Sequence, residues 1–228
     1  MSNVAVLIPC YNEENTIFDV VRNFKQCLPN ADIYVYDNNS TDHTAVFAEL
    51  AGAIVRKAPK QGKGNVIQQM FKDIDADCYL IVDGDNTYPV EPAREMIDII
   101  LNGQADMVVG DRLSSTYYEE NKSLARAMGN HLVCSLINKL FDGNVTDVMS
   151  GYRALSRNYV NTIDLHSDGF EIETEMTIKA LTSRMKIKSI PIQYRDRPEG
   201  SKSKLHTYSD GYKVLKLIVK MKRKIKNG

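Results

Sequence analysis

The sequence predicts an α/β protein with a mainly parallel central sheet and helices on both of its faces. Three observations support this fold class. Short apolar runs alternate with helical patterns through the first half of the chain, and this β-α-β-α order is typical of parallel sheets. The length of 228 residues is sufficient for one sizeable core. The composition, with 43% hydrophobic and 25% charged residues, is that of a globular protein.

The first half of the chain supplies five predicted strands and four predicted helices. Each strand is a short apolar run of β-type residues, and each helix has apolar residues at helical spacing. The strands are expected at residues 4–8, 33–36, 54–56, 79–82 and 107–109, and the helices at residues 14–27, 42–51, 64–74 and 91–101.

The second half is less regular. We expect helices at residues 123–140 and 171–183, with a strand at residues 187–193. No linker composition marks a boundary, so residues 1–210 are assigned to a single domain with two halves, 1–110 and 111–210, and residues 211–228 to a C-terminal helix.

That C-terminal segment is strongly basic. Residues 212–227 hold seven of the 29 basic residues and none of the 29 acidic ones, although the whole chain has a formal net charge of +0. Apolar residues recur in it at helical spacing, which predicts a basic amphipathic helix. Such a helix can lie on an anionic membrane surface, or it can pack on its own domain with a solvated basic face. Nucleic-acid binding is not expected, because the basic residues are not interleaved with aromatic ones.

Cysteine spacing and hydropathy indicate the compartment. Cys10, Cys27, Cys78 and Cys134 lack the spacing of a zinc site or a disulfide framework, so we expect reduced thiols. The first apolar run is too short for a signal peptide, and no run approaches the roughly 18 to 20 residues that span a bilayer. A cytoplasmic chain, attached peripherally to the cytoplasmic face of the membrane, is the interpretation that follows.

Polar motifs follow three of the predicted strands. Residues 9–13 follow the first strand, residues 37–42 the second, and Asp83-Gly84-Asp85 the fourth. In parallel sheets ligands bind beyond the carboxyl ends of the strands, so the three loops are expected to share one crevice. Two carboxylates one residue apart suit a hard divalent cation and the phosphates it carries. A solvated turn is the alternative for this tripeptide.

The motifs along the chain carry a family resemblance. In order they are V-A-V-L-I-P-C-Y-N-E-E from Val4, D-N-N-S-T-D from Asp37, Gly62-Lys63-Gly64, D-G-D from Asp83, Gly110-Asp111-Arg112, Arg126 with Asn130, D-V-M-S-G-Y-R-A-L from Asp147, F-E-I-E-T-E from Phe170 and R-P-E-G-S-K-S-K-L from Arg197. The combination resembles family 2 glycosyltransferases of the GT-A fold, a Rossmann-like α/β fold. Within that family it is similar to the polyprenyl-phosphate glycosyltransferases of the dolichyl-phosphate mannose synthase type.

The resemblance implies a nucleotide-sugar donor in residues 1–110. Donor-binding roles fall on Pro9, Tyr11, Glu13, Asp37, Asn38, Lys63, Gly64, Asp83 and Gly84. Asp85 is expected to bind Mg²⁺ or Mn²⁺ directly, with Asp83 nearer the ribose and the second phosphate. Many relatives have two acids where this chain has Asp37-Asn38, so the base remains open. Thr87 stands where some relatives supply an amide ligand, and a hydroxyl is a weaker one.

The acceptor is expected to bind in residues 111–210. A phosphate monoester is already a nucleophile at neutral pH and needs cations to hold it, whereas a hydroxyl acceptor needs a general base. Asp147 and Glu173 are the candidates for that base, and structural hydrogen bonds are their alternative role. The residues expected to bind an acceptor phosphate are Arg112, Arg126, Arg153, Arg197, Lys202 and Lys204, and those expected to be catalytic are Asp83, Asp85, Arg112, Arg126, Asp147 and Glu173.

These residues lead to one functional hypothesis and two alternatives. The hypothesis is a metal-dependent inverting glycosyltransferase that moves a hexose-type sugar from a UDP- or GDP-sugar to polyprenyl phosphate, with an anionic membrane or a membrane protein as its partner. One alternative is the same fold acting on a hydroxyl of a glycan or protein. The other is a nucleotide-sugar-binding subunit of a membrane assembly, without catalysis.

Overall fold

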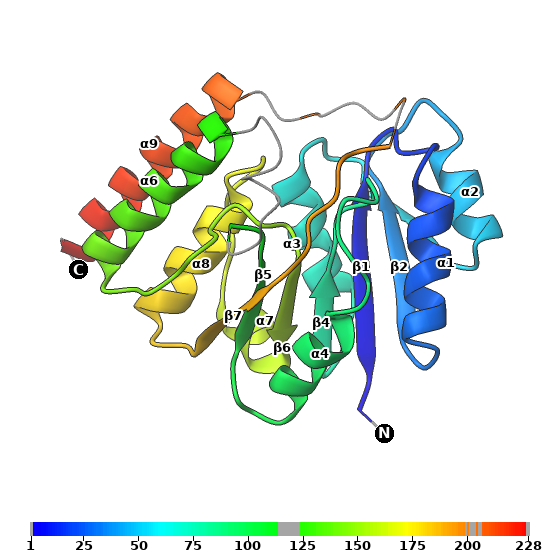
Figure 1. Ribbon diagram of the computed structural model, residues 1–228, viewed down its shortest axis with the longest axis horizontal. Helices are drawn as coiled ribbons and strands as arrows, with labels where there is room; N and C mark the ends of the chain where they lie inside the picture. Colours follow the sequence, from blue (N-terminus) through cyan, green and yellow to red (C-terminus); the bar gives the residue numbers. More distant parts are fainter. Residues whose placement is uncertain (1, 114–123, 199, 201–203, 205–206, 227–228) are drawn as a thin grey trace.

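The computed structural model describes residues 2–113, 124–198, 200, 204 and 207–226, and for residues 124–127, 207–208 and 225–226 it describes the backbone only. A seven-stranded sheet forms the centre, in the order β3-β2-β1-β4-β6-β5-β7 (Figure 1). Strand β6 pairs antiparallel with β4 and β5, and the other neighbours pair parallel. The strands are β1 Val4–Cys10, β2 Asp32–Asp37, β3 Ile54–Lys57, β4 Cys78–Ile81, β5 Met107–Asp111, β6 Arg153–Ser156 and β7 Ile187–Pro191.

Helices cover both faces of this sheet. The first face carries α1 Ile17–Cys27, α2 Thr44–Leu50 and α4 Ala93–Leu101, and the second carries α3 Lys63–Asp73, α7 Arg157–Thr162 and α8 Ile172–Thr182. The alternation of side chains along β1 explains the two layers. Val6 and Ile8 pack with the helices of the first face, whereas Ala5 and Leu7 pack with those of the second.

A third layer of helices lies outside α8. Helices α6 Leu124–Phe141 and α9 Thr207–Lys226 lie side by side there (Figure 1). A separate apolar cluster joins these helices, and it includes Ile137 from α6, Ile178 from α8 and Ile218 from α9. The segment of residues 192–198, which follows β7, crosses the front of the sheet toward β1 (Figure 1). It is therefore positioned over the carboxyl ends of the strands.

The predicted fold class is confirmed, and each predicted strand and helix of the first half is present within a few residues of its expected bounds. Strand β6 and helix α7 were not predicted. Strand β6 is the four-residue segment R-A-L-S, and its first residue, Arg153, is only 1% exposed. A buried arginine and so short a run give no strand-like alternation. None of the helices in the described residues is both long and apolar enough to cross a membrane.

Candidate functional site

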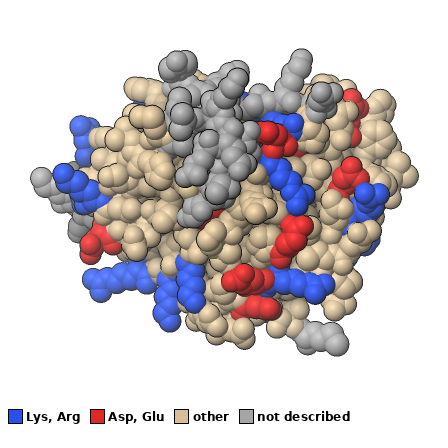
Figure 2. Space-filling model, in the orientation of Figure 1, with Lys and Arg blue, Asp and Glu red and all other residues tan. Residues whose placement is uncertain are grey.

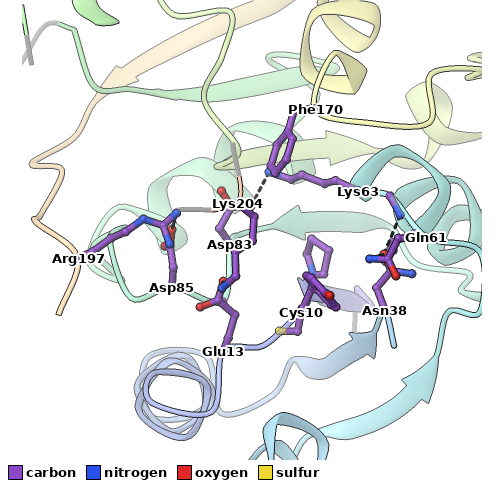
Figure 3. A pocket seen from close by; sticks show the side chains of 15 residues that line it. Cys10, Glu13, Asn38, Gln61, Lys63, Asp83, Asp85, Phe170, Arg197 and Lys204 are labelled. Carbon is purple, nitrogen blue, oxygen red and sulfur yellow. Dashed lines mark hydrogen bonds and ion pairs between the residues drawn. The ribbon is translucent and has the colours of Figure 1, made fainter. Parts of the chain in front are cut away.

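A cavity of about 250 Å³ lies at the carboxyl ends of β1, β2 and β4, beneath the segment that follows β7 (Figure 3). It brings together the three polar loops that the sequence predicted to share a crevice. It also includes Arg197 and Lys204 from the far end of the chain. The lining residues are Pro9, Cys10, Tyr11, Glu13, Asn38, Gln61, Gly62, Lys63, Val66, Asp83, Gly84, Asp85, Phe170, Arg197 and Lys204.

Asp83-Gly84-Asp85 forms one wall of this cavity and is not a solvated turn. The side chain of Asp85 is only 3% exposed, and that of Asp83 is 27% exposed. Gly84 packs against β1, where a Cβ atom would lie 2.7 Å from Cys10 Sγ. Its carbonyl accepts a hydrogen bond from Thr16 Oγ1 at 2.6 Å. The glycine therefore lets the loop approach β1 closely and present both acids at the strand end.

Asp85 is oriented by two groups. Its Oδ1 accepts hydrogen bonds from the backbone N–H of Thr87 at 3.2 Å and from Thr87 Oγ1 at 2.6 Å. Its Oδ2 forms an ion pair with Arg197. Burial and the nearby charge of Asp83 raise the pKa of Asp85, and Arg197 opposes that shift. Thr87 is completely buried and directs its hydroxyl at Asp85, so it orients the acid instead of facing the cavity.

Lys63 joins two carboxylates at the floor of the cavity. Its Nζ lies 2.6 Å from Asp83 Oδ1 and 2.6 Å from Glu173 Oε1. The ammonium also lies 5.8 Å from the centre of the Phe170 ring. Burial alone would lower the pKa of Lys63, but the two carboxylates raise it well above its usual range. The two carboxylates therefore favour the charged form of Lys63, which is already paired within the protein.

Gly64 was predicted to bind the donor, but it lies outside the cavity. Its N–H donates to the Asp168 carbonyl at 3.0 Å. A Cβ atom here would lie 2.0 Å from the carbonyl oxygen of Ser167. The close backbone approach that requires this glycine is thus to the loop before α8, which caps the N-terminus of α3.

Glu13 and Lys204 line the same cavity as the two aspartates (Figure 3). Lys204 Nζ is 2.5 Å from Glu13 Oε1 and donates to the Asn12 carbonyl at 2.8 Å. Glu13 Oε2 is buried, and no described residue forms a hydrogen bond with it. Burial raises the pKa of Glu13, although Lys204 counteracts the shift. A buried acceptor without a partner at a cavity wall is suited to a ligand hydroxyl.

Asp37 and Asn38 were predicted to contact the donor, but their side chains form hydrogen bonds within the protein. Asp37 does not line the cavity, and its Oδ1 accepts from the N–H of Ser40 at 3.1 Å. Asn38 lines the cavity, but its amide donates to the carbonyls of Ala58 and Lys60 and accepts from Gly62 N–H and Gln61 Nε2. Because the Asn38 amide is satisfied on both sides, it fixes the loop at residues 58–62 instead of offering its groups to a base.

Arg112 and Asp147 form a buried pair outside the cavity. Arg112 Nε and Nη2 donate to the two Asp147 oxygens at 2.8 and 3.0 Å, and Asn130 Nδ2 donates to Asp147 Oδ1 at 2.6 Å. Burial alone would raise the pKa of Asp147, but the Arg112 guanidinium and these hydrogen bonds lower it. An acid with a lowered pKa and its oxygens already occupied is a poor general base.

Arg153 is not placed to bind an acceptor phosphate. It is 1% exposed, and its guanidinium donates to the Ser150 and Val148 carbonyls and to Thr177 Oγ1. These contacts correct the sequence-based prediction, because the charge is enclosed by the core. Lys202 lies outside the described residues, and of Arg126 only the backbone is described, in α6.

The sequence did not single out Cys10, Gln61 or Phe170, which also line the cavity. Phe170 begins the F-E-I-E-T-E motif, and Gln61 precedes the Gly62-Lys63-Gly64 turn. The sequence signal for Phe170 and Gln61 was therefore their position in or beside a motif. Cys10 ends β1, where its burial raises the pKa of its thiol well above the usual range.

The donor set fits a hard divalent cation that is shared with a diphosphate. Asp83 and Asp85 supply two carboxylates from one loop, and a cation at Asp85 Oδ2 would take the place of the Arg197 guanidinium that pairs with this oxygen here. The described residues contain no cluster of three or more possible ligand side chains. Two carboxylates leave the other coordination positions to phosphate oxygens and water, which is the usual arrangement for Mg²⁺ bound with a substrate phosphate.

Comparison with known sequences assigns a family. The model of glycosyl transferase family 2 matches residues 5–164. Protein RfbJ from Shigella flexneri is 57% identical over 110 residues, which are 48% of this chain and 85% of RfbJ. Glycosyltransferase AglJ from Haloferax volcanii is 36% identical over 91% of this chain and 68% of its own length. The dolichyl-phosphate hexose transferase of the same organism is 29% identical over 96% of this chain and 93% of its own.

Comparison with solved structures supports the fold. Glucosyl-3-phosphoglycerate synthase from Mycobacterium tuberculosis, in complex with Mn²⁺, UDP-glucose and phosphoglyceric acid, superposes with a TM-score of 0.73 at 20% identity. The match covers 94% of this chain and 77% of the synthase. At this identity the likeness establishes the GT-A architecture alone.

Proposed function

The chain belongs to glycosyl transferase family 2, and from this membership we propose that it transfers a hexose-type sugar from a UDP- or GDP-sugar to polyprenyl phosphate at the cytoplasmic face of the membrane. The observation that carries the proposal is the pair of acids Asp83 and Asp85 at the end of β4, facing a cavity that also contains Lys63, Arg197 and Lys204. Two acids from one loop, with three cations in the same cavity, suit a metal-bound diphosphate.

The donor would be held by both ends of the cavity. Tyr11, 38% exposed, and Pro9 offer an apolar edge to the base, and the buried Glu13 Oε2 accepts a ribose hydroxyl. A divalent cation bound by Asp85 and Asp83 would offset the charge of the nucleoside diphosphate as it leaves. Arg197 and Lys204 add positive charge from the part of the chain that follows β7. The acceptor oxygen would then attack the anomeric carbon of the sugar as the bond from that carbon to the diphosphate breaks, which inverts the configuration.

We infer the acceptor class from the contacts of the two candidate bases. Asp147 is occupied by Arg112 and Asn130, and Glu173 is paired with Lys63. Neither acid is arranged to remove a proton from a hydroxyl. A phosphate monoester needs no such base, since its second pKa is about 6. The name of the related dolichyl-phosphate hexose transferase agrees with a lipid-phosphate acceptor. Arg112, Arg126, Lys202, Arg197 and Lys204 are the cations proposed to bind it.

Membrane attachment is proposed for the surface of α6 and α9. Met128 and Leu132 of α6 are 70% and 69% exposed, and Tyr212, Leu215 and Val219 of α9 are 67%, 45% and 48% exposed. Uncharged side chains and Lys or Arg side chains both reach the surface at the end of the molecule where these helices lie (Figure 2). Apolar side chains beside lysines suit the headgroup region of an anionic membrane.

The proposal is tested by measuring sugar transfer with purified protein. UDP- and GDP-sugars are supplied with Mn²⁺ or Mg²⁺ and a short-chain polyprenyl phosphate, and the glycolipid product is quantified. Asp85→Asn is expected to lower transfer about a hundred-fold or more, because a metal contributes several kcal/mol of charge stabilisation. Asp98→Asn, an exposed aspartate of α4, is the matched control and keeps full activity.

Other outcomes of this assay identify the alternatives. Transfer to a soluble glycan or protein hydroxyl, with none to the lipid phosphate, would replace the acceptor proposed here. Donor binding without turnover on either acceptor would indicate a nucleotide-sugar-binding subunit. Full transfer by Asp85→Asn in the presence of a chelator would refute the metal-dependent mechanism.

A further inference from the structure

Glu173 and Asp83 lie on opposite sides of one lysine. Lys63 Nζ is 2.6 Å from an oxygen of each acid. Asp83 lines the cavity, whereas Glu173 does not, and the Glu173 side chain is only 6% exposed. The three side chains therefore form a row from the buried first turn of α8, through the first residue of α3, to the cavity wall.

The row fixes the Asp83 carboxylate in one orientation. Its Oδ1 accepts from Lys63. The backbone of Gly151 lies against the same carboxylate, since a Cβ atom there would be 2.6 Å from Oδ2 and 2.9 Å from Lys63 Nζ. Asp83 thus has a lysine on one oxygen and tightly packed backbone beside the other.

Lys63 in turn depends on Glu173. A buried ammonium is costly unless carboxylates compensate it, and Lys63 is 10% exposed. Glu173 supplies that compensation from the second half of the chain. The loop before α8 also caps α3, through the Asp168 carbonyl that accepts from the N–H groups of Gly64 and Asn65. The first turns of α3 and α8 are consequently held together, with Lys63 between them.

We infer that Lys63 and Glu173 are positioning residues for Asp83, and that Glu173 acts on the donor site only through Lys63. This inference rests on the proposed function, because it takes Asp83 as part of the donor and metal site. It differs from the role of general base that the sequence suggested for Glu173. A base would act on the acceptor during turnover, whereas a positioning residue already affects donor binding when no acceptor is present.

The test is a double-variant cycle read as nucleotide affinity. Binding of UDP and of GDP in the presence of Mn²⁺ is measured by calorimetry without acceptor, for wild type, Lys63→Met, Glu173→Gln and the double variant. Each single substitution is expected to weaken binding about ten-fold, and the double variant is expected to bind no more weakly than Lys63→Met alone. Lys63→Arg, which keeps the charge, should restore part of the affinity.

A neighbouring ion pair provides the matched control. Lys60 Nζ lies 3.1 Å from Asp168 Oδ1 between the same two segments, but the two side chains are 73% and 67% exposed. Lys60→Met and Asp168→Asn should leave the affinity unchanged. Thermal unfolding of every variant verifies folding. If Lys63→Met does not fold, the comparison is made with Lys63→Arg in its place, and Glu173→Gln should then weaken binding less in the arginine background than in wild type.

Three results would overturn the inference. Fold-losses that multiply in the double variant would show that the two residues act independently. Unchanged nucleotide affinity in Glu173→Gln, with turnover lost, would make Glu173 a direct participant in the reaction. Absence of Mn²⁺-dependent nucleotide binding in wild type would instead refute the proposed function, and the inference with it.

Discussion

At the scale of single residues, Asp147 is a buried carboxylate with both oxygens hydrogen-bonded within the protein. Its oxygens accept from Arg112, from Asn130 and from the N–H of Met149, and its side chain is 0% exposed. Burial works against the charge, but these partners lower the pKa of Asp147 below its usual value. The stabilising contribution of this group is therefore tied to its ionised form.

The sign of the resulting pH dependence follows from the lowered pKa. The contribution of Asp147 to stability is fully present above the pKa of an unfolded aspartate, about 3.9, and is lost as the pH falls through the lower folded value. Asp147→Asn should cost about 3 kcal/mol at pH 7, because Arg112 loses its charged partner. The cost should shrink as the pH is lowered from 5 toward 3.

Urea unfolding of wild type and Asp147→Asn across that pH range measures this prediction, with Asp98→Asn as control. A difference between the two proteins that stays constant with pH would contradict it. Sequence reasoning found Asp147 but could not choose between a base and a structural acid. That choice depends on which donors reach the carboxylate, and these come from residues 17 and 35 positions away.

At the scale of elements, α3 begins against the loop that precedes α8. Gly64→Ala would place a Cβ atom 2.0 Å from the Ser167 carbonyl oxygen. Although alanine favours helices over glycine by up to about 1 kcal/mol, the backbone clash should dominate and destabilise the protein by about 2 kcal/mol. Denaturant unfolding gives the value. Gly129→Ala in α6 is the matched control, since apart from its own helix no described residue lies within 4 Å of the added Cβ atom, and it should be neutral or stabilising.

Helix α9 has a buried apolar side and an exposed one. Val214 and Ile218 pack against α6 and α8, whereas Leu215 and Val219 are about half-exposed. We predict that Leu215→Ser with Val219→Ser lowers co-sedimentation with vesicles containing anionic lipid about ten-fold, because exposed apolar area and basic charge bind that surface together.

Controls distinguish this binding from non-specific adsorption of exposed apolar side chains to vesicles. Leu50→Ser removes an apolar side chain of α2 that is 70% exposed, and it should leave vesicle binding unchanged. Binding should also fall as salt is raised or when the anionic lipid is replaced by a neutral one. Equal binding by the α9 variant and wild type would refute the proposed surface.

At the scale of the whole molecule, the parallel part of the sheet could be predicted because each strand is a local apolar run. The rule that ligands bind at strand ends then predicted that the loops with Glu13, Asn38 and Asp83 meet, and all three residues line the cavity. Strand β6 could not be predicted, since its antiparallel position between β4 and β5 depends on tertiary pairing. The same limit applies to Asn38, Arg153 and Gly64, whose residue types suggested ligand binding. Most of their partners are backbone groups that only the folded chain brings near.

The cavity draws its groups from both ends of the chain, so ligand binding should stabilise the molecule as a unit. Glu13 and Lys204 are 191 residues apart, and each pairs within the cavity. We predict that Mn²⁺ and a UDP- or GDP-sugar together raise the Tm by more than the sum of the two shifts that each ligand causes alone. The reason is that the cation offsets the charge of the diphosphate beside Asp83 and Asp85. At a ligand concentration of 100 Kd the stabilisation is about 2.7 kcal/mol, which is roughly 5 to 10 °C for a chain of this size.

Thermal unfolding with each nucleotide, with and without Mn²⁺, measures the effect and ranks the bases. Asp85→Asn should remove the metal-dependent part, and an equal shift in the presence of a chelator would show that the acids do not hold a metal.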